Sequence, residues 1–249
     1  MKISVITVTF NSDKTLKDTI ESVLKQTYKD IEYIIIDGLS SDKTVDIIRQ
    51  YEPKFKNCLK WISEKDKGLY DAMNKGFRMA TGDVIGIINS DDLFADDTAI
   101  EKMMNCFESH LTADAVYTNL YYVSQNDTSK IVRHWVCGKQ RSFKYGWHPA
   151  HPTFYVRKEI YQKYGLFDLN FEFAADFELM LRLIEKHNIK LVYLKESLVK
   201  MRLGGKTSKN LTNIKKGNIE CYHAFKKNGI HVNFLYPFFR LLPKLKQFF

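Results

Sequence analysis

The sequence of 249 residues lacks any apolar run of the about 20 residues that a membrane-spanning helix needs. It has only four cysteines, and they are far apart and form no CxxC pair, so it shows no zinc-site spacing. No signal peptide precedes the strand-like run that follows Met1. We therefore expect a cytoplasmic protein whose thiols are reduced.

Other missing features narrow the class of protein further. The sequence has no recognisable nucleic-acid-binding motif and no basic run interleaved with RNA-binding aromatic residues, so we expect no nucleic-acid partner. It also has no internal repeat and no Gly/Ser-rich linker, which indicates one continuous domain followed by a C-terminal extension.

The chain contains enough apolar residues for a full core, and it has an excess of positive charge. Hydrophobic residues make up 45% of it and aromatic residues 14%, which is sufficient for one large domain. The formal net charge is +9. Once nucleic acid is set aside, such an excess suits an anionic membrane surface or a phosphorylated ligand.

The first ninety residues alternate between strand-like and helix-like segments. Apolar, β-branched runs predict strands over 2–10, 31–36, 59–63 and 83–89. Apolar residues at helical spacing predict helices over 11–26, 39–51 and 68–82, the last with Leu69, Met73, Phe77 and Ala80 inward and closed by Gly82. This order predicts an α/β fold with a mostly parallel central sheet and helices on both faces.

The second half is less regular. It predicts strands over 114–123, 153–158 and 189–194 and an amphipathic helix over 176–188, with an aromatic, loop-rich segment over 124–150.

Polar residues follow the predicted strands at the points where they end. They are Thr9 and Asn11, Asp37, Glu64 and Asp66, and Asp91 and Asp92, after the first, second, third and fourth strands respectively. Ligands of open parallel sheets bind outside the carboxyl ends of the strands, so topology alone predicts a site here.

The stretch "GDVIGIINSDDLF" (82–94) is the most unusual of these strand ends, because an apolar strand runs into two adjacent carboxylates. Like charges repel, and each resists desolvation. A helix cap at Ser90, or at Asp96 and Asp97 before the next helix, is one interpretation. A divalent cation that keeps both acids ionised is the other.

Five ordered segments resemble the motifs of the family 2 glycosyltransferases: "SVITVTFN", "DGLSSDKT", "EKDKGLYDAMNKG", "TGDVIGIINSDD" and "AADFELMLRL". The resemblance covers about residues 2–205. It implies the nucleotide-sugar fold called GT-A, an inverting reaction, a nucleotide-sugar donor that we expect to be UDP-linked, and Mn²⁺ or Mg²⁺. The corresponding division is a nucleotide-binding half over 1–95, an acceptor and catalytic half over 96–205, and a helical, amphipathic extension over 206–249.

The resemblance also implies roles for single residues on the donor side. Asp92 matches the metal ligand, whereas Asp91 would contact the ribose or the donor sugar. The other implied donor contacts are Thr9, Asn11, Asp37, Asp66, Asp71 and Asn74. Lys67 is either near phosphate or a solvated lysine, and neither role is favoured. For Thr9 and Asn11 turn chemistry is the competing interpretation, and for Asp71 and Asn74 an ordinary exposed helix face.

On the acceptor side, Asp176 matches the family's general base, with Glu172 as the alternative. A helix cap is the competing role for Asp176. Trp147, His148 and His151 would face the acceptor, and Arg202 or Lys206 would bind the diphosphate unless they are surface charges.

The segment 234–249 mixes large apolar residues with three cations, which suits an anionic membrane surface, packing on the domain or a dimer contact. The function expected is transfer of a sugar to a hydroxyl of a saccharide or a lipid-linked saccharide, in surface polysaccharide biosynthesis. Two rivals are a non-catalytic sugar-nucleotide binder or scaffold and a nucleotidyltransferase, although the latter normally has a Gly-rich loop where this chain has "TFNSDKT".

Overall fold

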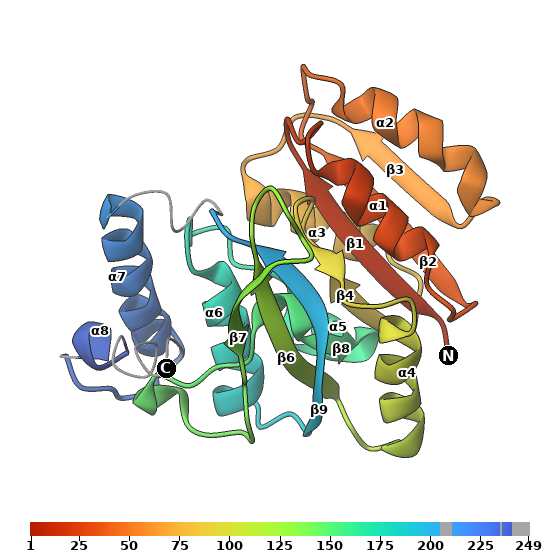
Figure 1. The fold of residues 1–249 in the computed structure, drawn as a ribbon. Helices are drawn as coiled ribbons and strands as arrows, with labels where there is room; N and C mark the ends of the chain where they lie inside the picture. The colour runs from red at the N-terminus through yellow and green to blue at the C-terminus, as the bar shows by residue number, and fades with distance from the viewer. Residues whose placement is uncertain (205–210, 235, 241–249) are drawn as a thin grey trace.

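The computed structural model describes residues 1–204, 211–234 and 236–240, and Figure 1 shows their arrangement. The strands are β1 (Ile3–Thr9), β2 (Ile31–Asp37), β3 (Leu59–Ser63), β4 (Val84–Ile87), β5 (Leu93–Phe94), β6 (Ala115–Val123), β7 (Ile131–Trp135), β8 (Tyr155–Arg157) and β9 (Leu191–Arg202). The α-helices are α1 (Leu16–Leu24), α2 (Thr44–Tyr51), α3 (Leu69–Met79), α4 (Ala99–Ser109), α5 (Lys158–Tyr164), α6 (Ala175–Leu181), α7 (Leu211–Lys227) and α8 (Tyr236–Phe239).

The described strands form one nine-stranded sheet with the order β3-β2-β1-β4-β8-β6-β9-β5, and β7 pairs with β6 beside this path. The first four strands of that order are parallel, as the alternating pattern predicts. Beyond them the sheet is mixed, because β8 is antiparallel to both of its neighbours and β6 is parallel to β9. The strands β1 and β4 are buried along their whole length, as expected for strands with helices on both faces.

The two halves of the sheet meet at Gly86 in β4. A Cβ atom there would lie 2.0 Å from the ring of Tyr155 in β8, so only glycine lets this buried ring lie against β4. Tyr155 is 1% exposed. The close approach joins the parallel half to the mixed half without a linker.

The predicted helices differ from those observed at their ends. The helices α1 and α2 begin at Leu16 and Thr44, five residues after their predicted starts. The helix α3 ends at Met79 rather than at Gly82, because Ala80 is extended and the Gly82 amide donates to the Ser4 hydroxyl at 2.9 Å. Leu69, predicted to face inward, is 39% exposed at the first position of α3. The helix predicted over 176–188 is α6 followed by a π-helical turn over Arg182–Lys186.

The described part of the C-terminal extension packs on the domain. Figure 1 shows α7 beside α6, on the side of the molecule away from β1 to β3. The Phe177 ring of α6 contacts the rings of Phe225 and Tyr236, with centroids 5.8 and 6.4 Å away. Residues 235 and 241–249 lie outside the described residues, and within the described part no helix has the length and apolarity to span a bilayer.

Candidate active site

The loops at the carboxyl ends of the parallel strands are tied to one another, and we call this region the donor edge (the strand ends and loops at 9–12, 37–41, 63–68 and 88–92). The hydroxyls of Ser12 and Ser90 lie 3.1 Å apart and join the loops after β1 and β4. The Asn11 side chain accepts from the Ser41 amide at 2.9 Å, and the Asn11 amide donates to the Ser40 hydroxyl. Asn11 has a φ of 48°, so its turn role is visible directly.

Two of the predicted donor contacts are buried at this edge. The Asp37 carboxylate is 0% exposed and accepts from the Ser40 amide and from the hydroxyls of Ser40 and Ser63. Its oxygens are thus used within the protein. Thr9 is 5% exposed, and its hydroxyl oxygen has no hydrogen-bond partner among the described residues.

The exposed part of the donor edge has an apolar surface beside a carboxylate. Phe10 is 63% exposed and Leu39 is 59% exposed, so two large apolar side chains face solvent at this edge. Gly38 lies between Phe10 and Asp66, because a Cβ atom on it would be 3.0 Å from Asp66 Oδ2 and 3.4 Å from the Phe10 ring. Lys75 holds Asp66 through an ion pair at 2.5 Å. An exposed ring beside a carboxylate can stack a base and accept hydrogen bonds from it.

The two acids of the "SDD" turn have different environments. Asp92 is 1% exposed, and its Oδ2 accepts from the Asn89 side chain at 2.8 Å while its Oδ1 accepts from the Arg202 amide at 3.2 Å. Burial, and next the charge of Asp91, raise the pKa of Asp92 well above its ordinary value. Asp91 is half-buried, and no described side chain donates to its carboxylate; burial raises its pKa, while Arg202 opposes the shift.

This geometry bears on which acid could hold a cation. No group of three or more His, Cys, Asp or Glu side chains in the described part of the chain is placed to bind a metal. A hard cation here would therefore need oxygens from the diphosphate and water besides a carboxylate, as Mg²⁺ sites on phosphates commonly do. No described side chain donates to the Asp91 carboxylate, whereas both oxygens of Asp92 are already hydrogen-bonded within the protein.

Arg202 is buried rather than open to a phosphate. It is 5% exposed, donates from Nη1 to the Asp91 carbonyl at 2.9 Å and pairs with Asp18 at 2.5 Å. It therefore holds the "SDD" turn and the end of β9 together. Lys206, the other predicted phosphate ligand, lies outside the described residues.

The helix α3 links the donor edge to the predicted base. Its Tyr70 hydroxyl donates to Asp176 Oδ1 at 3.3 Å, across 106 residues of sequence. Burial, and next the charge of Asp176, raise the pKa of Tyr70 well above its ordinary value, so this hydroxyl remains a donor at neutral pH. Asp176 is half-buried at the second position of α6.

The other two predicted residues of α3 have structural contacts. The Asp71 carboxylate accepts from the Lys67 amide at 3.0 Å, just before the helix begins. Asn74, expected on an exposed face, is 3% exposed and makes two hydrogen bonds to the Phe167 backbone, at 2.9 and 3.0 Å. The Phe167 ring in turn packs against Tyr70 and His151.

The charge of Asp176 acts on His151, one of the three predicted acceptor residues. Burial lowers its pKa below the ordinary 6.5, and the charge of Asp176 only partly opposes this, so the imidazole is neutral at pH 7. Trp147 instead donates to the Cys137 carbonyl at 2.8 Å, and the His148 ring packs on Trp135 and Phe177. These two belong to an aromatic cluster of the core.

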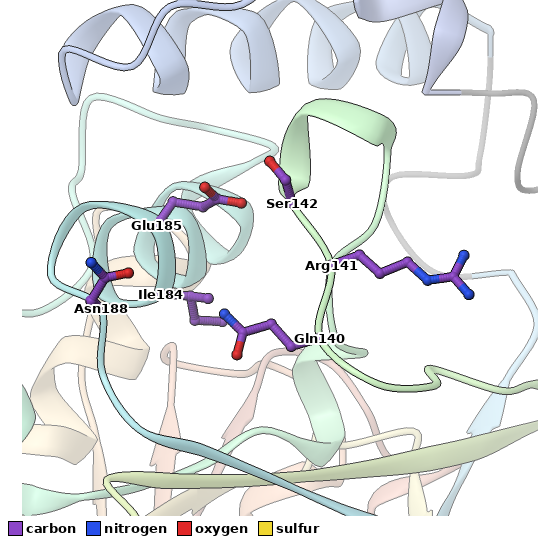
Figure 2. Close-up of a pocket in the computed structure, with 6 residues that line it drawn as sticks. All are labelled: Gln140, Arg141, Ser142, Ile184, Glu185 and Asn188. Carbon is purple, nitrogen blue, oxygen red and sulfur yellow. The ribbon is translucent and has the colours of Figure 1, made fainter.

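Figure 2 shows a cavity of about 360 Å³ that lies apart from these residues. Its lining residues are Gln140, Arg141, Ser142, Ile184, Glu185 and Asn188, between the loop before residue 143 and the π-helical turn. None of them belongs to the donor edge, so cavity size does not identify the candidate site. The candidate site is inferred instead from the polar residues at the strand ends.

Similarity to known proteins identifies the family. The model described as Glycosyl transferase family 2 matches residues 4–188. The chain belongs to this family. It is 28% identical over 240 residues to an uncharacterized glycosyltransferase of Methanocaldococcus jannaschii, covering 92% of this chain and 81% of the relative. It is 33% identical over 184 residues to one of Mycobacterium tuberculosis, covering 72% and 68%.

Solved structures of other glycosyltransferases have the same GT-A fold. A mannosyltransferase from Pyrobaculum calidifontis, in complex with GDP-Man and Mn²⁺, matches with a TM-score of 0.70 and 16% identity over 97% of this chain and 68% of its own. Residues 1–349 of S. aureus TarS, in complex with UDP-GlcNAc, match with a TM-score of 0.65 and 17% identity over 90% and 69%. The chain spans 41% of a longer TarS chain.

Two residues at or beside the candidate site were not among the predicted contacts. Phe10 follows directly on the first strand, and its position beside Thr9 and Asn11 was a usable signal. Tyr70 lies inside the "EKDKGLYDAMNKG" motif, but its contact with Asp176 depends on the packing of α3 against Phe167, in the segment before α6. No local pattern reports that contact.

Proposed function

We propose that the protein is an inverting glycosyltransferase that moves a sugar from a UDP-linked donor to a hydroxyl acceptor. The observation that carries this is the contact between Tyr70 and Asp176, which sets a half-buried carboxylate beside the helix that follows the donor edge. Membership of family 2 supports the same class of reaction. The TarS structure with UDP-GlcNAc supports a uridine nucleotide, and the mannosyltransferase with GDP-Man makes guanosine the main alternative.

In the proposed reaction the acceptor oxygen attacks the anomeric carbon of the donor. The bond between that carbon and the β-phosphate oxygen breaks, and its electron pair leaves on the nucleoside diphosphate. Asp176 takes the proton of the acceptor hydroxyl as a general base. Tyr70 keeps the carboxylate oriented, and the neutral His151 ring adds no competing charge. Glu172, the alternative base, is exposed and less suited to this role.

The donor would lie along the donor edge. Phe10 offers a surface on which the base can stack, with Asp66 beside it as a hydrogen-bond acceptor. Asp91 would hold Mn²⁺ or Mg²⁺, and such a cation when bound neutralises charge on the departing diphosphate. Asp92 would instead stabilise the turn through its hydrogen bonds from the Asn89 side chain and the Arg202 amide. The metal role that the family resemblance implies for Asp92 is thus proposed for Asp91.

Biosynthesis of a surface polysaccharide or glycolipid fits the relatives, one of which is named a PGL/p-HBAD biosynthesis glycosyltransferase in Mycobacterium bovis. We further propose a cytoplasmic protein that binds anionic lipid through the end of its chain. Its test is flotation with anionic vesicles, with and without residues 241–249. The deletion should begin after Arg240, because Tyr236 and Arg240 are buried and pack on Phe177.

The experiment that tests the function is calorimetric titration of UDP, GDP and dTDP, each with and without Mn²⁺. We expect UDP to bind and Mn²⁺ to tighten its binding. If GDP alone binds, the guanosine alternative replaces the uridine one. Absence of binding by every nucleotide, in a folded sample, would overturn the proposal and leave the scaffold function. Binding without release of UDP from any UDP-sugar and acceptor would favour a non-catalytic binder.

A further inference from the structure

Glu220, in the C-terminal helix α7, binds the chain segment that leads to the proposed base. Its Oε1 accepts from the Glu172 amide at 3.1 Å, and its Oε2 accepts from the amides of Phe173 and Ala174 at 2.8 and 2.9 Å. One carboxylate thus satisfies three consecutive backbone N–H groups. Asp176 follows only two residues after the last of them.

Within the first turn of α6, the Asp176 carboxylate accepts from the Phe177 amide at 2.8 Å, but the amides just before the turn need a partner from elsewhere. Ala174 is the residue before the first helical turn, and no side chain of the helix caps it. The N–H groups at a helix start are unsatisfied unless another group accepts from them, and a carboxylate there also meets the positive end of the helix dipole. Glu220 supplies both effects from 46 residues away.

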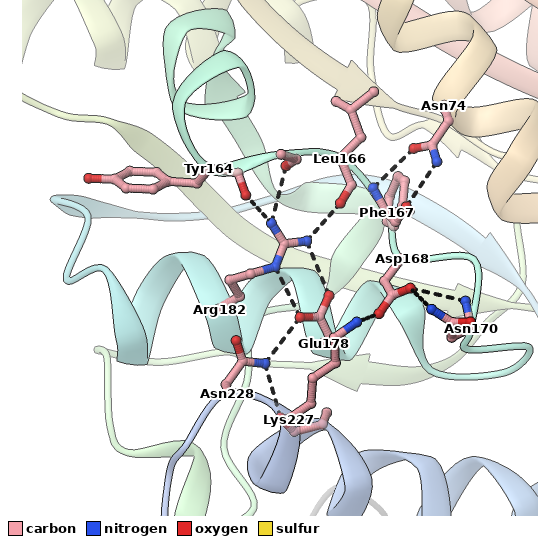
Figure 3. A network of polar contacts seen from close by, with 12 residues as sticks. Asn74, Tyr164, Leu166, Phe167, Asp168, Asn170, Glu178, Arg182, Lys227 and Asn228 are labelled. Atoms are coloured by element: carbon pink, nitrogen blue, oxygen red, sulfur yellow. Dashed lines mark hydrogen bonds and ion pairs between the residues drawn. The ribbon is translucent and has the colours of Figure 1, made fainter.

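A second contact between α7 and α6 lies just beyond Asp176. Glu178 is 0% exposed, pairs with Arg182 at 3.0 Å and accepts from the Asn228 side chain at 3.0 Å. Figure 3 shows Arg182 continuing this network to the carbonyls of the loop at 164–166. Lys227 pairs with Asp168 in the same region (Figure 3). Asp176 therefore lies between two anchor points, Glu220 before it and Asn228 after it.

We infer that α7 is a positioning element of the catalytic site, and that Glu220 is a positioning residue that sets where the Asp176 carboxylate lies. The inference rests on the proposed function, in which Asp176 is the base. The family model ends at residue 188, so α7 lies beyond the part that it matches. A general base must lie within hydrogen-bond reach of the proton that it takes, and a displacement of about 1 Å can cost about 100-fold in rate.

The test compares Glu220→Gln with the matched control Asp114→Asn in the full chain. The Asp114 carboxylate also accepts from a backbone amide, that of Lys190 at 2.7 Å, but no contact links it to α6. Release of UDP from UDP-GlcNAc and of GDP from GDP-mannose, with Mn²⁺ and a panel of saccharide acceptors, gives kcat and donor KM. Calorimetry gives nucleotide affinity, and hydrogen exchange gives the protection of the amides at 172–174.

We expect Glu220→Gln to lower kcat about 10- to 100-fold, to speed exchange at 172–174 and to leave donor KM and nucleotide affinity within about twofold. In an Asp176→Asn background the same substitution should have no further effect on kcat, which a general loss of structure would not reproduce. Glu220→Asp, which keeps the charge, should recover part of the rate. Asp114→Asn should change none of these quantities.

An unchanged kcat in a folded Glu220→Gln variant of an active enzyme would overturn the inference while leaving the proposed function intact. A further drop in kcat on the Asp176→Asn background would also overturn it, since Glu220 would then act independently of the base. If the wild type binds no nucleotide, the proposed function itself fails. An unchanged rate of hydrogen exchange at 172–174 in Glu220→Gln would contradict the role of Glu220 in holding this segment, even without an assay of turnover.

Discussion

Tyr70 and Asp176 lie 106 residues apart in the chain, and the tyrosine hydroxyl donates to the aspartate carboxylate at 3.3 Å. Tyr70 belongs to α3, which follows the donor edge, and Asp176 belongs to α6 in the other half of the domain. The contact therefore joins the proposed donor site to the proposed base. Most of the predictions below depend on it or on the residues at the donor edge.

The first prediction concerns the base. Asp176→Asn should lower kcat by about 10²- to 10⁴-fold, the usual contribution of a general base, and should leave nucleotide affinity unchanged. Glu172→Gln is the matched control, because Glu172 is exposed and only four residues away. Steady-state kinetics with calorimetry make the comparison. Loss of turnover in Glu172→Gln with turnover retained in Asp176→Asn would transfer the role to Glu172.

The second prediction concerns turnover by Tyr70→Phe. The Tyr70 hydroxyl donates to Asp176 Oδ1 at 3.3 Å and would orient the proposed base, so its loss should lower kcat about 10- to 100-fold and leave nucleotide affinity unchanged. Tyr155→Phe is the control, since the buried Tyr155 hydroxyl has no hydrogen-bond partner in the described part of the chain. An unchanged kcat in Tyr70→Phe would show that Tyr70 does not act on the base.

The third prediction separates the two acids of the "SDD" turn. Asp91→Asn should abolish the gain in nucleotide affinity that Mn²⁺ provides, with little change in thermal unfolding, because its carboxylate has no donor among the described side chains. Asp92→Asn should lower the free energy of unfolding by about 1–3 kcal/mol, because a buried and hydrogen-bonded group is altered. Calorimetry and urea unfolding distinguish them. The opposite pattern would restore Asp92 as the metal ligand.

The fourth prediction tests the exposed ring at the donor edge. Phe10→Ala should weaken nucleotide binding by about 1–3 kcal/mol, the usual contribution of one stacked base, with an unchanged melting temperature because the ring is 63% exposed. Tyr145→Ala removes a ring that is 78% exposed away from the donor edge, and it should have no effect. Equal affinities for Phe10→Ala and the wild type would place the base elsewhere.

The fifth prediction concerns stability and pH at Glu32, which is 2% exposed in β2. Burial would raise its pKa, but hydrogen bonds from Lys60, Ser4 and Thr81 outweigh burial and lower it to about 2 from 4.5. A depressed pKa contributes stability above the unfolded value, and this contribution is lost as the pH falls from about 4.5 to about 2. Glu32→Gln should therefore destabilise the protein at pH 6 and much less at pH 3.

Urea unfolding at both pH values measures this difference. Glu101→Gln is the control. Its carboxylate accepts a solvent-exposed hydrogen bond from Thr27, which should contribute little to the free energy of unfolding at either pH. A destabilisation by Glu32→Gln that is equal at pH 6 and pH 3 would mean that shape rather than charge explains the effect of Glu32.

The strands in the first half of the chain and their parallel pairing could be predicted from the sequence because the information is local. A fully buried strand requires a continuous apolar run, and such runs lie at β1, β2 and β4. Parallel strands also place their carboxyl ends together, so the donor edge follows from the alternation alone. The direction of β8 could not be predicted in this way, because three residues carry no signal of orientation.

The roles of single polar residues were harder to predict from the sequence. Asn74 and Asp37 have the residue types of ligand contacts, yet burial and internal hydrogen bonds engage both. Asp91 and Asp92 are adjacent and chemically identical, so only their difference in exposure separates them. A residue type at a strand end indicates a site, but the direction of its side chain decides whether it can touch a ligand.

The family, the parallel half of the sheet and the edge proposed for the nucleotide sugar follow from the sequence, because short motifs and hydrophobic periodicity encode them. The contact of Tyr70 with Asp176 and the hydrogen bonds of Glu220 to the segment before it are seen in the three-dimensional arrangement alone. Both contacts join elements that are far apart in the chain. They arise because α3 packs on Tyr161 and Phe167 before α6 and because α7 packs on α6, and no local pattern encodes either packing.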